Sequence, residues 1–269
     1  MKRLKKLVKG FIWAICSNKE GLNKVRILSG PAKGARLAMD IRKGGSYWLG
    51  TYDDWILKSL PLDKIIKNNW VVWDCGAFYG YYTAIFRKTV NNGIIHTFEA
   101  SGKNFDILKT LPALNNWDNV FIHHLAVGPD HSSIKFVNNM GGSNGPFGLS
   151  KIYNVPAEEL EIEEVRCCGV DELVYEMKVE APDFIKFDLE SAEEFALHNG
   201  DRLFVEKKPT VLLELHGEAA LIAAGRFLER FNYQAILPWE FNNPSVEMSN
   251  LDELQALQYI PHMIYCSPK

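Results

Sequence analysis

Polar side chains stand where several predicted buried strands of this chain end. In an open α/β sheet the carboxyl ends of parallel strands meet at one edge, where ligands bind. Burying several carboxylates at such an edge costs free energy unless a ligand or a hydrogen-bond donor satisfies them. We therefore predict a cleft in which carboxylates bind hydroxyl or amino groups, or remove a proton. The side chains concerned are Asp74, Glu99, Asp188, Glu214 and His216.

The stretch Val71–Thr83 reads VVWDCGAFYGYYT and predicts a strand, a tight glycine turn and a helix. The apolar, β-branched start suits a strand that is buried on both faces. Gly76 and Gly80 allow the backbone to approach a ligand closely, and a helix start offers free N–H groups. This turn should therefore hold part of a ligand.

The acids on either side of this turn favour one class of ligand. Glu99, at the end of the next predicted strand, stands where a carboxylate accepts the ribose hydroxyls of an adenosine cofactor. A dinucleotide needs G-x-G-x-x-G, whereas this turn reads D-x-G-A-x-x-G, and Asp74 would repel a pyrophosphate. The same carboxylate suits the amino group of S-adenosylmethionine (SAM). The motif thus favours SAM over NAD.

Strands and helices alternate from Val71 onward, which indicates a parallel sheet. Residues 138–151, rich in Gly, Asn and Ser, predict a mobile loop, and helices are expected around 104–111, 171–176 and 190–197 and over Glu218–Phe231. The predicted strands are Val71–Trp73, Ile94–Ala100, Val120–Val127, Ser133–Val137, Val165–Val170, Phe184–Leu189, Thr210–His216, Gln234–Leu237 and Met263–Cys266.

Residues 1–66 predict a helical and hairpin extension before a domain over 67–269. Val25–Leu28 and Ala35–Met39 alternate like a hairpin, and YWLGTYDDWIL begins an aromatic, then helical, segment. Residues 1–16 form a basic amphipathic pattern that is too short to span a bilayer. That helix either packs on the domain or contacts an anionic membrane surface peripherally.

These motifs together resemble the FkbM family of SAM-dependent methyltransferases. The stretch VVWDCGAFYGYYT looks like its first SAM motif, and HTFEAS (96–101) like its acidic second-strand motif. The segment DFIKFDLESAEEFALHNG (183–200) is similar to the family signature, and PTVLLELHG (209–217) to the strand that follows. Ser191 stands where the family has Gly.

The resemblance implies an α/β class I Rossmann-like fold: a seven-stranded mixed sheet flanked by helices, with Met263–Cys266 antiparallel. It also implies methylation of a hydroxyl on a glycan or small-molecule metabolite. An inactive SAM-binding regulatory or scaffold protein and an NAD-dependent oxidoreductase remain alternatives. Cofactor contacts are then expected from Asp74, Gly76, Ala77, Tyr79, Gly80, Thr83, Glu99, Ala100, Asn104, Leu125, Ala126 and Asp188.

Methyl transfer to a hydroxyl also needs a group that removes the hydroxyl proton. The candidate catalytic residues are Asp188, Glu190 and His216, whose imidazole ordinarily titrates near neutral pH. Tyr47 and Tyr52 could line the acceptor site as stacking aromatics. Oxygen-rich clusters also suit a divalent cation, but no metal is predicted here.

Composition excludes several other classes. With 47% hydrophobic and 23% charged residues, the 269-residue chain is ordinary for a globular protein. A formal net charge of −3 gives no basic field for nucleic acid. Five scattered cysteines suit a reducing compartment, and no segment is long enough to span a membrane, so a cytoplasmic location is expected.

Overall fold

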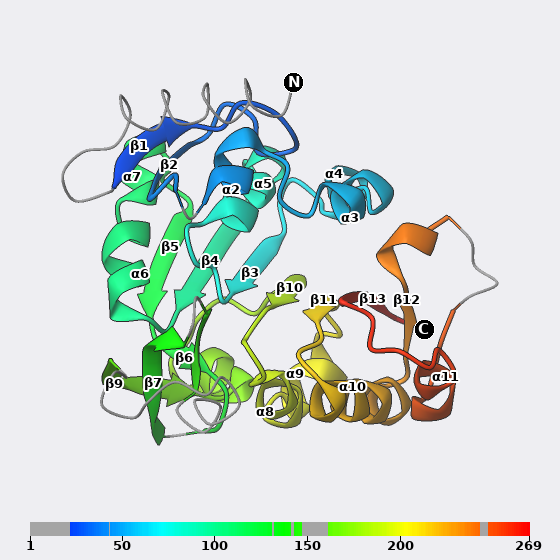
Figure 1. Ribbon diagram of the computed structural model, residues 1–269. Helices are drawn as coiled ribbons and strands as arrows, with labels where there is room; N and C mark the ends of the chain where they lie inside the picture. Colours follow the sequence, from blue (N-terminus) through cyan, green and yellow to red (C-terminus); the bar gives the residue numbers. More distant parts are fainter. Residues whose placement is uncertain (1–21, 43, 131, 141–142, 147–160, 243–246) are drawn as a thin grey trace.

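The computed structural model describes residues 22–42, 44–130, 132–140, 143–146, 161–242 and 247–269 (Figure 1). Its central sheet has seven strands in the order β12-β13-β11-β10-β3-β4-β5. The strands are β3 (Val71–Cys75), β4 (Ile94–Glu99), β5 (Val120–His124), β10 (Phe184–Phe187), β11 (Thr210–Glu214), β12 (Tyr233–Ile236) and β13 (Met263–Pro268).

The predicted class I Rossmann-like sheet is confirmed by this strand order. The neighbours from β5 to β11 pair in parallel, and β13 runs antiparallel to both β11 and β12. The chain passes from β3 outward to β5 and then returns to β10 on the other side of β3. The strand order therefore reverses between β3 and β10, which is where an open α/β sheet binds its ligands.

Helices cover both faces of the sheet. One face carries α8 (Glu193–His198), α9 (Asp201–Glu206) and α10 (Glu218–Phe231). The bounds of α10 are those predicted from the sequence. The other carries α5 (Tyr81–Thr89), α6 (Gly102–Leu108) and α7 (Leu111–Asn115), and α11 (Leu251–Gln255) packs on α10. The alanine-rich sequence of α10 favours helix, and it ends where Asn232 turns left-handed.

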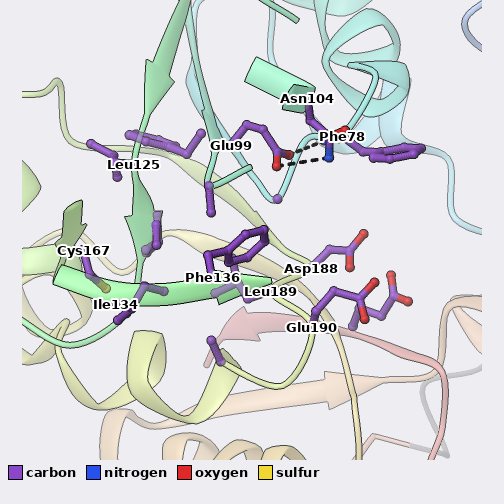
Figure 2. A pocket seen from close by; sticks show the side chains of 18 of the residues that line it. Phe78, Glu99, Asn104, Leu125, Ile134, Phe136, Cys167, Asp188, Leu189 and Glu190 are labelled. Carbon is purple, nitrogen blue, oxygen red and sulfur yellow. Dashed lines mark hydrogen bonds between the residues drawn. The ribbon is translucent and has the colours of Figure 1, made fainter. Parts of the chain in front are cut away.

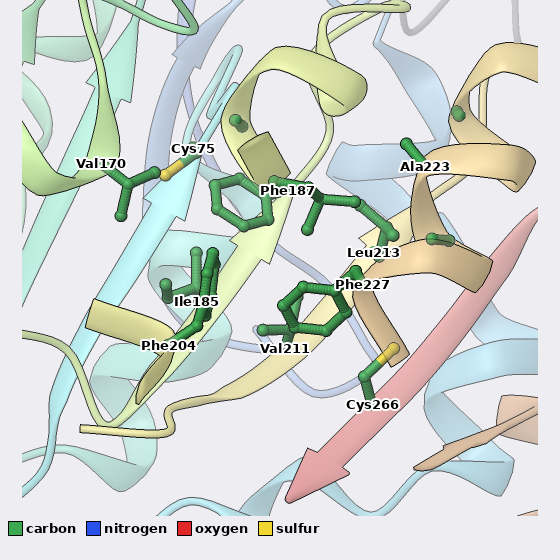
Figure 3. Close-up of a cluster of buried hydrophobic side chains, with 14 of the residues drawn as sticks. Cys75, Val170, Ile185, Phe187, Phe204, Val211, Leu213, Ala223, Phe227 and Cys266 are labelled. Carbon is green, nitrogen blue, oxygen red and sulfur yellow. The ribbon is translucent and has the colours of Figure 1, made fainter. Parts of the chain in front are cut away.

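Burial on both faces explains the apolar runs in the strands. Phe187 of β10, Leu213 of β11 and Cys266 of β13 belong to one buried cluster with Phe227 of α10 (Figure 3). Leu212, one residue from Leu213, points to the opposite cluster because side chains alternate along a strand. The sheet is thus the middle of three layers.

A second sheet of four strands corrects two expectations. It has the order β6-β9-β7-β8, so the strands predicted near 133–137 and 165–170 form this sheet instead of joining the central one. The prediction of a loop over 138–151 is wrong for residues 138–140 and 143–146, which are strand. Pairing between β7 and β8 overrides their polar composition. The rest of that loop lies outside the described residues. The strands are β6 (Ala126–Val127), β7 (Ser132–Met140), β8 (Ser143–Pro146) and β9 (Ile162–Cys168).

The N-terminal segment packs against the central sheet. Strands β1 (Asn23–Arg26) and β2 (Arg36–Met39) form the expected antiparallel hairpin, and Leu37 shares a core cluster with Val72 and Phe86. Three short helices follow: α2 (Gly45–Leu49), α3 (Asp54–Ser59) and α4 (Leu62–Ile65). The amphipathic pattern of residues 1–16 lies outside the described residues. Within the described ranges, no helix combines the length and hydrophobicity needed to cross a membrane.

We expect Leu213→Ala to lower the free energy of unfolding by about 2–5 kcal/mol, because it leaves a cavity in a fully buried position. The matched control is Val205→Ala on α9, where the side chain is 63% exposed; its effect should stay within about 0.5 kcal/mol. Chemical denaturation measures both values. Equal values for the two variants would contradict the packing described for β11.

Candidate active site

A cavity of about 590 Å³ opens at the point where the strand order reverses (Figure 2). We call it the switch-point cavity. One side is formed by the ends of β3 and β4, a second by the turn after β10 together with the end of β11, and a third by the second sheet. Of the predicted site residues, those that line it are Gly76, Glu99, Ala100, Asn104, Leu125, Ala126, Asp188 and Glu190.

The glycine turn brings two strand ends into close contact. Gly76 has a φ of +82°, and a Cβ there would lie 1.7 Å from the carbonyl oxygen of Asp188. Its N–H and that of Ala77 both donate to the Phe98 carbonyl oxygen, at 3.0 and 3.1 Å. The glycine is therefore required because the turn after β3 packs against the turn after β10.

The carboxylate of Glu99 is held at the end of β4 by three donors. The N–H of Phe78 donates to Oε2 at 2.8 Å, and the Asn104 amide donates to Oε1 at 3.4 Å (Figure 2). The N–H of Ser101 also donates to Oε1, at 2.9 Å. Burial raises the pKa of Glu99 to about 7, although these donors lower it. Carboxylate oxygens can accept further bonds, so Glu99 can still bind hydroxyl groups in the cavity.

Asp74 lies beneath the cavity and outside its lining. The side chain is fully buried, and its Oδ2 accepts a hydrogen bond from Thr83 Oγ1 at 2.5 Å. Burial raises the pKa of Asp74, and the charge of Lys186 lowers it. The other predicted site residues that are outside the lining are Ala77, Tyr79, Gly80, Thr83 and His216.

Lys186 is a buried cation among the strand-end acids. In the middle of β10, it lies opposite Asp74 in the register and on the same face as Asp188, two residues later. Its Nζ donates to Asp188 Oδ2 at 2.9 Å and lies 4.7 Å from the centre of the Tyr82 ring. Burial lowers the pKa of Lys186, but the charges of Asp188, Asp74 and Glu214 outweigh this effect and raise it.

His216 is oriented by a buried carboxylate. Its Nδ1 lies 2.8 Å from Oε1 of Glu193, which is fully buried and also accepts the N–H of Leu189 at 2.9 Å. Its Nε2 faces three further carboxylates: Glu214 at 3.4 Å, Glu190 at 3.9 Å and Asp188 at 4.0 Å. We call Asp188, Glu190, Glu193 and Glu214 the acidic cluster.

The acidic cluster changes the protonation expected for His216. Burial lowers its pKa, but hydrogen bonds to Glu193 and Glu214 and their charges raise it to about 11. At neutral pH the imidazole therefore carries both protons and has no lone pair with which to accept another. His216 was predicted as a base because an imidazole ordinarily titrates near neutral pH, and that ordinary pKa does not apply in this environment.

Glu190 reaches the cavity through an unusual backbone conformation. The helix expected from Glu190 begins only at Glu193, because Glu190 and Ser191 have φ values of +50° and +77°. Two consecutive left-handed residues are costly for side chains other than Gly. Burial, with the charges of Asp188 and Glu214, raises the pKa of Glu190 to about 7, although the charge of His216 lowers it.

Several site residues escaped the sequence analysis. Lys186 had a signal, because a lysine inside the otherwise apolar strand FIKF needs buried acids beside it. Glu193 lies in the segment 183–200 that resembles the family signature, but no strand-end pattern marked it, and its helix was expected to start earlier. Ile134, Phe136 and Cys167 lie on strands that were predicted, but the sequence did not indicate that these strands form a second sheet. Together with Leu125 they form an apolar wall of the cavity (Figure 2).

Three groups could also coordinate a cation. Asp188, Glu214 and His216 place ligand atoms within 4.8 Å of one another. In the described structure Asp188 already pairs with Lys186, and His216 with Glu193 and Glu214. The prediction that no metal is used stays a prediction.

The aromatic residues that the sequence analysis proposed for the methyl-acceptor site line the same cavity as Asp188, Glu190 and Glu214. Tyr47 and Tyr52 line the cavity and stack on each other with ring centres 4.2 Å apart. The ring centre of Tyr47 also lies 5.8 Å from that of Phe78. The N-terminal segment therefore supplies part of the cavity.

Comparisons with known proteins connect this geometry to one family. The sequence model of the Methyltransferase FkbM domain matches residues 74–237, which is more than half of the chain. A crystal structure of the FkbM methyltransferase from Methylobacillus flagellatus KT is 18% identical, with a TM-score of 0.48, over 75% of this chain and 44% of that chain. The chain thus spans less than half the length of that protein.

Other solved structures match more weakly. An O-methyltransferase from Bacillus cereus, in complex with SAH, is 12% identical over 81% of each chain, with a TM-score of 0.41. Fibrillarin from Aeropyrum pernix, with natively bound SAM, is 11% identical over 78% of this chain and 73% of that chain, with a TM-score of 0.42. No curated protein matches. The fold assignment rests on strand order, because these scores are low.

The protonation of His216 should appear in the pH dependence of stability. Its pKa rises from 6.5 to about 11 on folding, so its contribution is fully present below pH 6.5 and is lost as the pH rises toward 11. Between pH 7 and 10, His216→Gln should therefore lose stability less steeply than the unmodified protein. Denaturation at each pH measures this, with His198→Gln, exposed on α8, as control. Parallel curves for His216→Gln and the unmodified protein would refute the assignment.

Proposed function

Because this chain belongs to the FkbM methyltransferase domain family, we propose that it is a SAM-dependent enzyme that methylates a hydroxyl oxygen of a glycan or small-molecule metabolite. The observation that carries the proposal is the division of the switch-point cavity. Glu99 and an apolar wall line one part, and Asp188, Glu190 and Glu214 of the acidic cluster line the other. One cavity therefore offers a nucleoside site beside a proton-accepting site.

The first part of the cavity fits an adenosyl cofactor. Glu99 has lone pairs left for the ribose hydroxyls, and Leu125, Ala126 and Phe136 offer apolar surface for the base. Gly76 keeps the backbone close without a side chain. When bound, SAM would supply the methyl group on its sulfonium sulfur. The acceptor oxygen would bond to that methyl group, the sulfur–methyl bond would break, and SAH and the hydroxyl proton would leave.

The acidic cluster supports removal of the hydroxyl proton by Glu190. General bases work best with a pKa near the working pH, and the pKa of Glu190 is about 7. The charged His216 lies 3.9 Å from Glu190 Oε2 and can hold that carboxylate toward the cavity. Glu193 orients His216, and Lys186 offsets the charge of Asp188. Asp188 and His216 then act beside Glu190 as positioning groups.

Ligand binding separates this proposal from the NAD alternative. SAM and SAH, but not NAD, should stabilise the protein by about 2.7 kcal/mol at 100 times the dissociation constant, which raises the melting temperature by several degrees. Glu99→Gln should weaken this shift because it removes an acceptor for the ribose hydroxyls. A shift with NAD alone, or none with either adenosyl ligand, would overturn the cofactor assignment.

Replacement of the proposed base separates an enzyme from a SAM-binding scaffold. Glu190→Gln should reduce transfer of labelled methyl from SAM to cell-extract acceptors by about 10²–10⁴-fold, while SAM binding persists. With Glu190 intact, the rate should rise with pH through about 7 as its carboxyl group loses its proton.

The neighbouring variant Glu194→Gln, outside the cavity lining, serves as control and should keep full activity. The labelled product should survive mild base, as a methyl ether does and a methyl ester does not. Undiminished transfer by Glu190→Gln would remove this residue from its role. No transfer by the unmodified protein to any extract would favour the scaffold.

A further inference from the structure

Two tryptophans from distant segments meet beside the acidic cluster. Trp55 on α3 and Trp239 on η4 (Pro238–Glu240) have ring centres 5.1 Å apart and planes 40° apart. Trp55 is 51% exposed, whereas Trp239 is partly buried against the main core. One indole is thus anchored, and the other presents much of its surface to solvent.

His262 connects this aromatic pair to the switch-point cavity. Its ring centre lies 6.2 Å from that of Trp55. Its Nδ1 lies 3.5 Å from Oε1 of Glu214, which lines the cavity, and its Nε2 lies 3.8 Å from Oδ1 of Asp53. The N–H of Leu215 donates to the His262 carbonyl oxygen at 3.0 Å and holds the segment against the end of β11. We call Trp55, Trp239 and His262 the tryptophan platform.

The charges around the platform restrict what can bind there. Asp53 and the acidic cluster supply carboxylates, and the cations that face them are Lys186, His216 and His262. Each of these three cations already pairs with a carboxylate, at 2.9 Å for Lys186, 2.8 Å for His216 and 3.5 Å for His262. A phosphate or carboxylate on the acceptor would therefore meet carboxyl groups beside cations that are already engaged.

We propose that the methyl acceptor is a neutral saccharide whose ring stacks on the tryptophan platform, a proposal that rests on the proposed function. A pyranose has an apolar C–H face and a rim of hydroxyl groups. The exposed indole of Trp55 can cover that face, and the carboxylates of Glu214 and Glu190 can accept hydrogen bonds from the rim. The platform thereby brings one hydroxyl to the acidic cluster.

Other acceptor classes fit these features less well. A lipid or a flat aromatic alcohol is bound best between apolar walls, whereas the platform offers one exposed indole beside charged groups. An acidic sugar could stack on the indole, but the cations that its carboxylate would need are already paired with acids. The combination of an open aromatic face with hydroxyl-accepting acids therefore favours a neutral ring.

Ligand-observed saturation-transfer NMR on the SAH-loaded protein tests this assignment. The probes are methyl glycosides of glucose, galactose, mannose and rhamnose, with methyl glucuronide as the anionic counterpart. We expect signals from at least one neutral glycoside and none from the glucuronide. Trp55→Ala should weaken the binding of that glycoside about tenfold through loss of stacking, and Trp55→Phe should restore most of it.

Phe121→Ala is the matched control, because Phe121 is 46% exposed on β5, at the opposite edge of the central sheet. It should leave glycoside binding unchanged, and SAH binding should be the same in every variant. Preferential binding of the glucuronide, equal glycoside binding by Trp55→Ala, or no binding of any neutral glycoside by the SAH-loaded protein would overturn the proposal. Failure to bind SAH would instead overturn the proposed function.

Discussion

The ammonium group of Lys186 is the charge on which the rest of the site depends. It is almost fully buried in the middle of β10, with Asp74 opposite and Asp188 two residues later on the same face. Without it, the buried Asp74 would lose the charge that opposes its desolvation, and Asp188 would lose its donor at 2.9 Å. Removing one partner of a buried charged set is strongly destabilising. The lysine thus lets a parallel sheet concentrate acids where its strand order reverses.

The backbone around this charge is as restricted as the side chains. The turn after β3 touches the turn after β10 so closely that a Cβ at Gly76 would overlap the Asp188 carbonyl oxygen. Beyond that contact, Glu190 and Ser191 adopt left-handed conformations before α8 begins. Such strain persists only where surrounding contacts over-determine it, and here it coincides with Glu190, the residue that we propose as the base.

Sequence patterns predicted the sheet because its signals are local. Apolar runs marked the strands, and strand-end acids such as Glu99 and Glu214 marked the edge that lines the cavity. Asp74 followed the same pattern but turned inward to Thr83, a choice made by tertiary packing. The strands now seen as β7 and β9 were predicted, but not that they form a sheet of their own. Strand β8 was missed because its polar residues become a strand only by pairing with β7. The protonation of His216 depends on Glu193, 23 residues away, which no local pattern connects to it.

The tryptophan platform has an evolutionary consequence. Asp53 and Trp55 precede the segment that matches the FkbM domain, and Trp239 and His262 follow it, since the match covers residues 74–237. Glu99, Lys186 and the acidic cluster all lie inside that segment. Under our proposals, the residues that recognise the acceptor lie in the flanks of that segment, and the residues that act on it lie inside the segment. Specificity and chemistry in this fold would then be separately heritable traits.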